Sequence, residues 1–472
     1  MMLLLFACFS KQGSPETVGA VSAPVQAQEA IPEVPVAKDF YPPEPSLFSL
    51  SNGSQLWLLE KPELPLLVLN IVLPGGYGSD GDQWGRSDLA AEMLSQSAGN
   101  RSAREVSSAL HKLATSVGVS SYSSNTVVSI SMHKDRIQDV LPIVSDMMYR
   151  PAFSDEDWNR IRGQAVLGAE QIRQDPRSIG YQYSGYFYHG SDHPLGTPSY
   201  GTPTSLAALD KEDVQRWHQE RLVGQEISFV VVGDISSEAA IEGLQEHFPE
   251  WSGQSFAQPT PPPAQEARSG EVLLIDMPGA QQTTIRIVSN AYDVGSADSS
   301  AANQAARIMG GSFTSRLNSL LREEKGYTYG IGCGFSETRF GATFAVSTSV
   351  RTDVTTEALQ DIYATLNSAI EGFSTEEVQK SKVLDRTDRI ESVESRASIA
   401  GMLTSMVIMN RSTDHQRAEI SAVSAVTAED MKTAGQYLLP ERGLTLLIGD
   451  AEQIKQPLLE AGFSIEEVGL PE

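Results

Sequence analysis

The chain has 472 residues. This length is too great for one ordinary hydrophobic core, so two or more domains are expected. It carries 60 acidic and 35 basic residues, a formal net charge of −25, which argues against nucleic acid or an anionic membrane surface as a partner. With only two cysteines, Cys8 and Cys333, the sequence excludes a disulfide framework.

The N-terminus predicts export. Residues 1–7 are apolar and Cys8 follows at once, so that residues 5–8 (LFAC) resemble a bacterial lipobox, where the signal is cut before a cysteine that receives lipid. The apolar run is too short to span a bilayer. We expect a signal remnant over 1–8, lipidation of Cys8, and a periplasmic or membrane-anchored lipoprotein of a bacterium. The alternative is a ragged start with a chance cysteine. Residues 9–40 are rich in Pro, Ala, Gln, Glu and Ser, which predicts a flexible tether.

The remainder is predicted to be a duplication, because two halves show the same order of elements. Apolar runs bounded by Pro and Gly predict strands, and longer periodic stretches predict helices. For the first half we predict strands at 55–60 and 66–73, helices at 87–96 and 103–116, a strand region at 118–132 and a helix at 137–149. For the second half we predict strands at 271–276 and 283–288, helices at 299–309 and 315–324, strands at 327–337 and 341–349, and a helix at 355–370. Each half ends on a buried-strand run closing on Gly-Asp, at 227–234 and 444–450.

A segment with four prolines, 255–270, lies between the halves and predicts a linker. We therefore expect an N-terminal domain over 41–254 and a C-terminal domain over 271–472. Strands and helices do not alternate strictly, which favours an α+β fold over a doubly wound sheet. The expected architecture is two homologous α/β-sandwich domains, each a mixed sheet with helices packed on one face.

Five local patterns together resemble the pitrilysin/insulinase family of zinc metallopeptidases, in its short bacterial form with two similar domains. They are GG at 75–76 with GRSDLAAEML at 85–94, YRPAF at 149–153, HPLGTP at 193–198, GGSFTSRL at 310–317, and LREEKGYTY at 321–329. The resemblance runs from Phe40 onward and implies the fold of that family.

The resemblance fails at the metal. Active members carry H-x-x-E-H on a helix of the first domain, where two histidines bind zinc and the glutamate activates a water. Here Asp88 stands at the first histidine, Ala91 at the glutamate and Glu92 at the second histidine. Glu170 is the nearest candidate for the distant glutamate ligand. Two hard carboxylates can hold magnesium or calcium weakly, but they are not a zinc site. We therefore expect no metal on this chain, and interpret Asp88 and Glu92 as charges on a partly exposed helix face.

Residues 189–193 spell H-x-x-D-H and offer a second place for a metal. Two histidines four residues apart face the same way only on a helix. Because Gly190, Pro194 and Gly196 predict a loop, we favour a structural role for His189 and His193.

The second half keeps a different part of the family's machinery. Active members use an Arg/Tyr pair from the second domain, and by resemblance Arg322 and Tyr329 match that pair with its seven-residue offset. Arginine offers forked donors to a carbonyl or carboxylate, and a tyrosine hydroxyl can donate to an oxyanion. Tyr327 and Arg316 are the competing choices. The opposing interpretation is that Arg322 pairs with a neighbouring glutamate and Tyr329 packs in a strand.

The resemblance thus implies a non-catalytic subunit that completes the site of a zinc-bearing, paralogous peptidase subunit acting on peptides. Zinc is expected in that partner, and contact with a membrane only through the lipid anchor. Two alternatives stay open: a scaffold or peptide-binding protein with no role in proteolysis, and an autonomous hydrolase with an altered metal site at Asp88 and Glu92.

Overall fold

The structure is a computed structural model that describes residues 40–251, 253, 256–262 and 268–472. The predicted signal remnant with Cys8, almost all of the predicted tether, and part of the predicted linker lie outside these residues. Residues Tyr41–Glu472 form one compact unit. In the described part of the chain, every helix is too short or too polar to cross a membrane.

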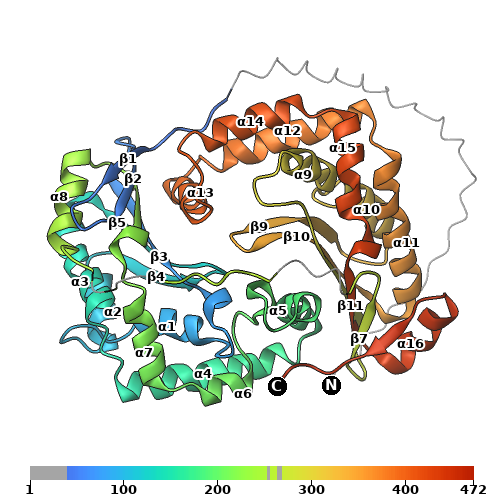
Figure 1. The fold of residues 1–472 in the computed structure, drawn as a ribbon, viewed down its shortest axis with the longest axis horizontal. Coiled ribbons are helices and arrows are strands. Elements are labelled where there is room, and N and C mark those ends of the chain that lie inside the picture. Colours follow the sequence, from blue (N-terminus) through green and yellow to red (C-terminus); the bar gives the residue numbers. More distant parts are fainter. Residues whose placement is uncertain (1–39, 252, 254–255, 263–267) are drawn as a thin grey trace, which may run out of the picture. The chain divides into compact units, whose positions relative to one another are not determined.

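Two six-stranded sheets organise this unit (Figure 1). The first has the order β1-β2-β6-β3-β5-β4, and the second has the order β12-β7-β11-β8-β10-β9. The strands of the first sheet are β1 (Ser46–Ser49), β2 (Gln55–Glu60), β3 (Leu66–Pro74), β4 (Ser116–Ser121), β5 (Asn125–His133) and β6 (Ser228–Gly233). Those of the second are β7 (Val272–Asp276), β8 (Gln282–Asn290), β9 (Ile331–Thr338), β10 (Gly341–Arg351), β11 (Leu444–Gly449) and β12 (Ile465–Glu467).

Five strands of each sheet follow the same path. β2 pairs parallel with β6 as β7 does with β11, while the pairs β3–β6, β3–β5 and β4–β5 are antiparallel like β8–β11, β8–β10 and β9–β10. The predicted fold, two α/β layers of the same layout, is confirmed. Over the described residues, the last strand of each sheet, β4 or β9, has one backbone edge without a neighbouring strand.

Helices cover the sheets. Those of the first half are α1 (Arg86–Leu94), α2 (Ala103–Lys112), α3 (Ile137–Tyr149), α4 (Asp155–Ile172), α5 (Pro176–His189), α6 (Pro203–Ala208), α7 (Lys211–Glu220) and α8 (Ser237–His247). Those of the second half are α9 (Asp298–Met309), α10 (Arg316–Asn318), α11 (Thr355–Asn367), α12 (Thr375–Glu391), α13 (Arg396–Ile408), α14 (His415–Ala425), α15 (Ala428–Ala434) and α16 (Ala451–Glu460).

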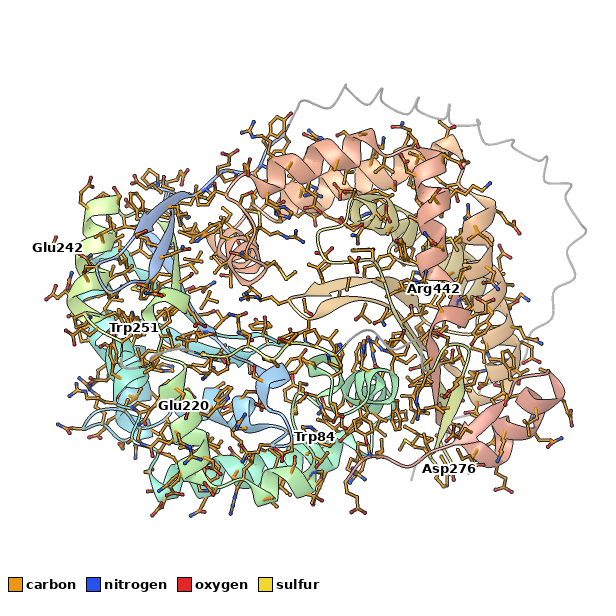
Figure 2. All side chains as sticks on the ribbon, in the orientation of Figure 1. Trp84, Glu220, Glu242, Trp251, Asp276 and Arg442 are labelled. Atoms are coloured by element: carbon orange, nitrogen blue, oxygen red, sulfur yellow. The ribbon has the colours of Figure 1, made fainter. Side chains whose placement is uncertain are left out.

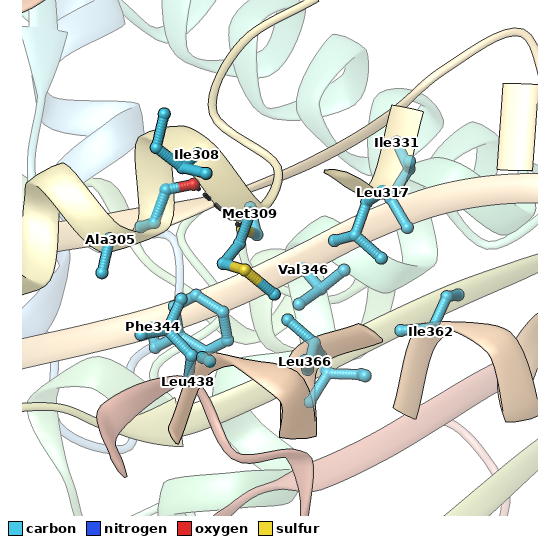
Figure 3. Close-up of a cluster of buried hydrophobic side chains, with 14 of the residues drawn as sticks. Ala305, Ile308, Met309, Leu317, Ile331, Phe344, Val346, Ile362, Leu366 and Leu438 are labelled. Carbon is cyan, nitrogen blue, oxygen red and sulfur yellow. Dashed lines mark hydrogen bonds between the residues drawn. The ribbon is translucent and has the colours of Figure 1, made fainter. Parts of the chain in front are cut away.

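The largest core lies between one face of the second sheet and the helices α9 and α11 (Figure 3). Met309 and Phe344 meet there with Val346, Ile362 and Leu366, all fully buried. Along β10 these side chains alternate with partly exposed ones, the period-two pattern of a strand with one packed face. A corresponding core joins the first sheet to α3 and α8.

The opposite face of each sheet is covered by one helix from the other half of the chain. Helix α13 packs on β3 and β6, where Leu403 and Met406 meet Trp57 and Val230. Helix α5 packs on β8 and β11, where Ile179 and Tyr183 join a cluster that includes Leu446. The structure therefore adds a second covering layer to the expected one-sided arrangement. It also explains why β6 and β11 are buried along their whole length.

Several predicted boundaries were wrong. The strand region 118–132 is two strands, β4 and β5, and the helix predicted to end at 116 ends at Lys112 because β4 begins at Ser116. The predicted helix 315–324 is the short α10 followed by a π-helix, Ser319–Glu324. The strand predicted from Tyr327 begins only at Ile331, because Gly326 has a φ of 62° and turns the chain before the strand.

Candidate functional site

Helix α1 carries the degenerate metal motif and lies against the edge strand β4. Its first turn is fixed by Asp80, a buried carboxylate that accepts hydrogen bonds from the backbone N–H of Gly85 at 3.2 Å and of Ser87 at 3.1 Å. Asp88 is partly buried and Glu92, one turn later, is exposed. Ala91 is 1% exposed, so a methyl group fills the place where active relatives present their base.

The electrostatics of this helix do not suit zinc. Burial, and after it the charge of Glu92, raises the pKa of Asp88 to about 7. A carboxyl group that holds a proton near neutral pH is a weak metal ligand. Glu170 lies exposed on α4, and over the described residues no three His, Cys, Asp or Glu side chains come close enough to hold an ion. Asp88, Glu92 and Glu170 are therefore not brought together, and the two-carboxylate set of α1 does not fit zinc.

His189 and His193 come together in an unexpected way. His189 is the last residue of α5 and His193 lies in the loop that follows, yet the two imidazole rings stack with centroids 4.6 Å apart. Burial lowers the pKa of His189 to about 3, and His193 Nδ1 accepts a hydrogen bond of 3.0 Å from Leu195 N–H. Stacked rings direct their nitrogens into parallel planes rather than at one point, and the pair helps to close the loop.

The loop segment 319–330, which joins α10 to β9, carries Arg322 in its π-helical first part and Tyr329 near its end. Asn318 fixes both ends of this loop, since its carboxamide donates to Ile331 O at 2.9 Å and accepts from Ile331 N–H at 3.1 Å. Thr328 Oγ1 accepts from Gly330 N–H at 3.1 Å and from Thr348 Oγ1 at 3.0 Å. The backbone on both sides of Tyr329 is thus held in place, while the Tyr329 side chain is 94% exposed.

Arg322 sits within the π-helix, a rare local structure that is frequent at functional sites. Its guanidinium lies 4.2 Å from the ring centroid of Phe313 and 3.4 Å from Glu323 Oε1. The Phe313 side chain is 65% exposed. Phe313 belongs to the motif at 310–317, but neither Phe313 nor Asn318 was predicted from the sequence to have a role.

The two competing residues have structural partners. Arg316 makes two hydrogen bonds of 2.8 Å to the carboxylate of Glu377 and a third to Gly372 O. Tyr327 is partly buried and packs against the main core of the second sheet. Arg322 does pair with a neighbouring glutamate, as the opposing interpretation held, but Tyr329 does not pack in a strand.

Arg322, Tyr329 and Phe313 line a cavity of about 930 Å³, called here the arginine cavity. Its other walls are the N-terminal turn of α5, with Arg177 and Tyr181, and the face of β8, β10 and β9 that α5 leaves uncovered. Arg286 of β8 stacks at 4.4 Å over the Tyr181 ring. Burial lowers the pKa of Arg286, and hydrogen bonding to Ser347 lowers that of Tyr181.

A second cavity of about 650 Å³, called here the strand cavity, is lined by β4, β9 and α13, with Ser116, Gly118, Glu337 and Thr404 among its residues. Ser336 of β9 lines both cavities. Residues of both edge strands, β4 and β9, thus line the strand cavity together with residues of β3 and β5, and Ser336 is common to the two cavities.

Comparisons with known proteins identify this fold. The family model described as Insulinase (Peptidase family M16) matches residues 71–180, and the one described as Peptidase M16 inactive domain matches residues 208–383. The uncharacterized zinc protease YmxG of Bacillus subtilis is 18% identical over 80% of this chain and 92% of its own length. The zinc protease PqqE of Helicobacter pylori is 22% identical over 60% of this chain and 65% of its own.

Solved structures agree. A peptidase M16 inactive domain from Pseudomonas fluorescens superposes with a TM-score of 0.79 at 21% identity, covering 86% of this chain and 98% of that one. A protease from Helicobacter pylori gives 0.78 at 17% identity, covering 87% and 100%.

The fold and the two matching family models, which together span more than half of the sequence, define a homologue of zinc metallopeptidases. The chain belongs to peptidase family M16, the pitrilysin/insulinase family, and the expected resemblance is confirmed.

Proposed function

We propose that this chain is the non-catalytic subunit of a heterodimeric zinc metallopeptidase that degrades peptides or unfolded polypeptides. A paralogous subunit would bring zinc and the water-activating glutamate. Arg322 and Tyr329 of this chain would bind the substrate carbonyl and the oxyanion. The observation that carries the proposal is the near-complete exposure of Tyr329 on a loop whose ends are fixed by Asn318.

The chemistry follows from that placement. When a water attacks a peptide carbonyl, negative charge develops on the carbonyl oxygen, and a donor aimed at that oxygen stabilises the transition state more than the ground state. The Tyr329 hydroxyl and the Arg322 guanidinium are donors of this kind. Because the loop backbone is already held, little reorganisation opposes their action when a partner subunit encloses the site.

The strand cavity supports a peptide as the substrate. In the part of the chain that the structure describes, β4 and β9 end their sheets, so that one edge of each has no neighbouring strand. An extended peptide can pair with such an edge as an additional strand, which requires unfolded substrate but no particular side chain.

The test is reconstitution. The full chain is mixed with a zinc-bearing M16 subunit from the same genome, and cleavage of a quenched fluorescent peptide is followed with and without a chelator. We expect no cleavage by the chain alone and chelator-sensitive cleavage by the mixture. Arg322→Gln and Tyr329→Phe should each lower kcat by about 10²-fold, the range seen when one oxyanion donor is removed.

Tyr327→Phe is the matched control. It removes a hydroxyl only two residues before Tyr329, but from a side chain that packs on the core. It should leave kcat unchanged, and size-exclusion chromatography should show the same complex for all variants. Chelator-sensitive cleavage by the isolated chain would contradict the proposal. A stable complex whose kcat is unchanged by Arg322→Gln and by Tyr329→Phe would favour the scaffold alternative.

A further inference from the structure

The floor of the arginine cavity is an open stretch of peptide backbone. Ser347 of β10 lies between Arg286 of β8 and Gly332 of β9 in the strand register, and Gly334 follows on the same face of β9. A side chain added at Gly332 or Gly334 would meet nothing within 4 Å. Main-chain groups of a bound peptide can therefore approach this floor closely, as a glycine-lined surface allows.

The walls are positively charged, in contrast to the rest of the chain. Arg177, Arg286 and Arg322 line the cavity, and Asp175 is its one acidic residue among those described. The Asp175 carboxylate is already engaged, because it accepts a hydrogen bond of 2.7 Å from Ser178 N–H at the start of α5. Three arginines against two carboxylates, Asp175 and the Glu323 that pairs with Arg322, stand out in a protein with a net charge of −25.

Two of these arginines lack an ionic partner. Within the described chain, neither the Arg286 nor the Arg177 guanidinium forms an ion pair with a carboxylate. Both guanidiniums lie on the ring of Tyr181, with centroid distances of 4.4 Å for Arg286 and 5.9 Å for Arg177. A partly buried arginine on a central strand without a counter-ion is costly, and a bound anion would remove that cost.

The geometry of the donors points to the kind of anion. A guanidinium fork matches the two oxygens of a carboxylate, and the peptide-sized floor lies directly beside Arg286. The aromatic side chains of Phe313 and Tyr329 offer apolar contact a short distance along the same cavity. A nucleic acid or another polyanion would be repelled by the surrounding negative charge.

We propose that the arginine cavity binds a carboxylate of a peptide substrate at Arg286, with Tyr181 and Arg177 completing the subsite. The inference rests on the proposed function only in taking a peptide as the ligand. It assigns this chain a preference for peptides that place a C-terminal carboxylate or an acidic side chain in the cavity.

The test measures binding to the full chain alone, without a zinc subunit. Three six-residue peptides carry a neutral dansyl group at the N-terminus and differ only in their carboxylates. The first ends in a free acid, the second ends in an amide and has no charge, and the third is the amide peptide with a single glutamate. Fluorescence anisotropy should show the free-acid or the glutamate peptide binding at least about tenfold more tightly than the plain amide. Preference for the free acid identifies the terminal carboxylate as the ligand, and preference for the glutamate peptide identifies an acidic side chain.

Arg286→Gln should remove this preference, and Arg442→Gln should keep it. Arg442, which is labelled in Figure 2, is a matched control. Its guanidinium also stacks on a tyrosine, Tyr437, at 5.4 Å, but Arg442 is not among the residues that line the cavity. Arg177→Gln serves as the second variant should Arg286→Gln fail to fold. Arg177 is exposed, and its replacement should weaken binding of the preferred peptide several-fold without changing thermal stability.

Equal binding of all three peptides would overturn the inference. So would an undiminished preference in folded Arg286→Gln, since that result assigns Arg286 the purely structural task of holding α5 on the sheet through Tyr181 and Ser184. Neither result bears on reconstituted cleavage. Conversely, a failed reconstitution leaves the peptide preference of the isolated chain to stand or fall separately.

Discussion

The side-chain amide of Asn70 on β3 donates a buried hydrogen bond of 2.9 Å to Thr404 Oγ1 on α13. The two residues are 334 positions apart in the chain. This bond joins the first sheet to the helix that the second half places over it, within an otherwise apolar contact of Trp57, Val230 and Leu403. A polar pair in such a place fixes how α13 sits on the sheet.

Replacing Thr404 by valine should therefore destabilise the protein out of proportion to the small change in shape. Thr404→Val leaves the buried Asn70 amide without its acceptor, which costs about 1–3 kcal/mol of unfolding free energy. Thr404→Ser keeps the hydroxyl and should lose less. Urea denaturation followed by circular dichroism measures both. Equal stability of Thr404→Val and the parent would show that the bond contributes nothing net.

Arg316 and Arg322, one on each side of Asn318, should lose stability to different extents when each is replaced by glutamine. Arg316 is held by Glu377, Ser368 and Gly372, so Arg316→Gln should lower the unfolding free energy by about 1–3 kcal/mol. The pair of Arg322 with Glu323 is exposed and contributes less than about 1 kcal/mol. Thermal unfolding distinguishes them, and a marked loss of stability in Arg322→Gln would indicate a structural rather than a functional arginine.

Asp88 should make stability depend on pH in a defined direction. Its pKa in the folded protein is about 7, above the ordinary value near 3.8, so the folded state holds the proton more tightly than the unfolded state. Stability is therefore lost as the pH rises from about 4 to about 7, and the penalty stays constant above that range. Asp88→Asn removes it and should be more stable than the parent at pH 8, on the order of 1–3 kcal/mol.

The gain from Asp88→Asn should fade as the pH falls toward 4, where the parent carboxyl is protonated. Glu92→Gln is the companion variant, because it removes only the second contribution to the raised pKa and should give a smaller gain at pH 8. Denaturation midpoints at five or six pH values provide the comparison. Parallel curves for Asp88→Asn and the parent would contradict the assignment.

Gly76 should tolerate no side chain, although its backbone is extended. A Cβ at this position would lie 1.8 Å from the carbonyl oxygen of Tyr122, and the hairpin between β4 and β5 would have to move. Gly76→Ala should cost about 1–3 kcal/mol or more. Gly118→Ala, on β4 with nothing within 4 Å of the added carbon, should change stability by less than about 0.5 kcal/mol. Urea denaturation of the pair checks the contrast.

The donor set of α1 leads to a prediction about metal content. Chain purified without chelator should carry far less than one zinc per molecule by plasma emission, and a chelator should leave its thermal unfolding unchanged. The zinc-bearing subunit, treated in parallel, should contain about one zinc per molecule. Stoichiometric, tightly held zinc in the isolated chain would refute the interpretation that Asp88 and Glu92 form no zinc site. It would also refute the proposal that a partner subunit supplies the zinc.

Much of the fold was predictable because its signals are local. The strands that became β2, β3, β7 and β8 are apolar runs ended by Pro or Gly, and their order repeats in the two halves. The packing of α5 and α13 on the sheet of the other half was not predicted. Long-range packing decides on which sheet α5 and α13 lie. A periodic pattern in the sequence indicates that a helix has an apolar face, but not which of the two sheets that face will cover.

The candidate site divides in the same way. Asp88, Ala91, Glu92, Arg322 and Tyr329 were found because they stand at known positions of a family motif. Arg286 and Tyr181 were not found, since a single arginine in a strand and a single tyrosine in a helix 105 positions earlier carry no local signal. Only the packing of α5 on β8 brings them within 4.4 Å. The role of Asn318 was not predicted for a similar reason, because its hydrogen-bond partner, Ile331, lies thirteen residues away across the loop.

The crossing of α5 and α13 to the opposite sheets means that the two halves cannot be separated without damage. A fragment ending near the proline-rich segment would bare the strand faces that Leu403 and Met406 shield, and its counterpart would bare those beneath Ile179 and Tyr183. Each fragment would expose a large apolar surface and would aggregate when expressed alone. Produced together, they would reassociate into a nicked but native assembly, which would allow split reporters and isotope labelling of one half at a time.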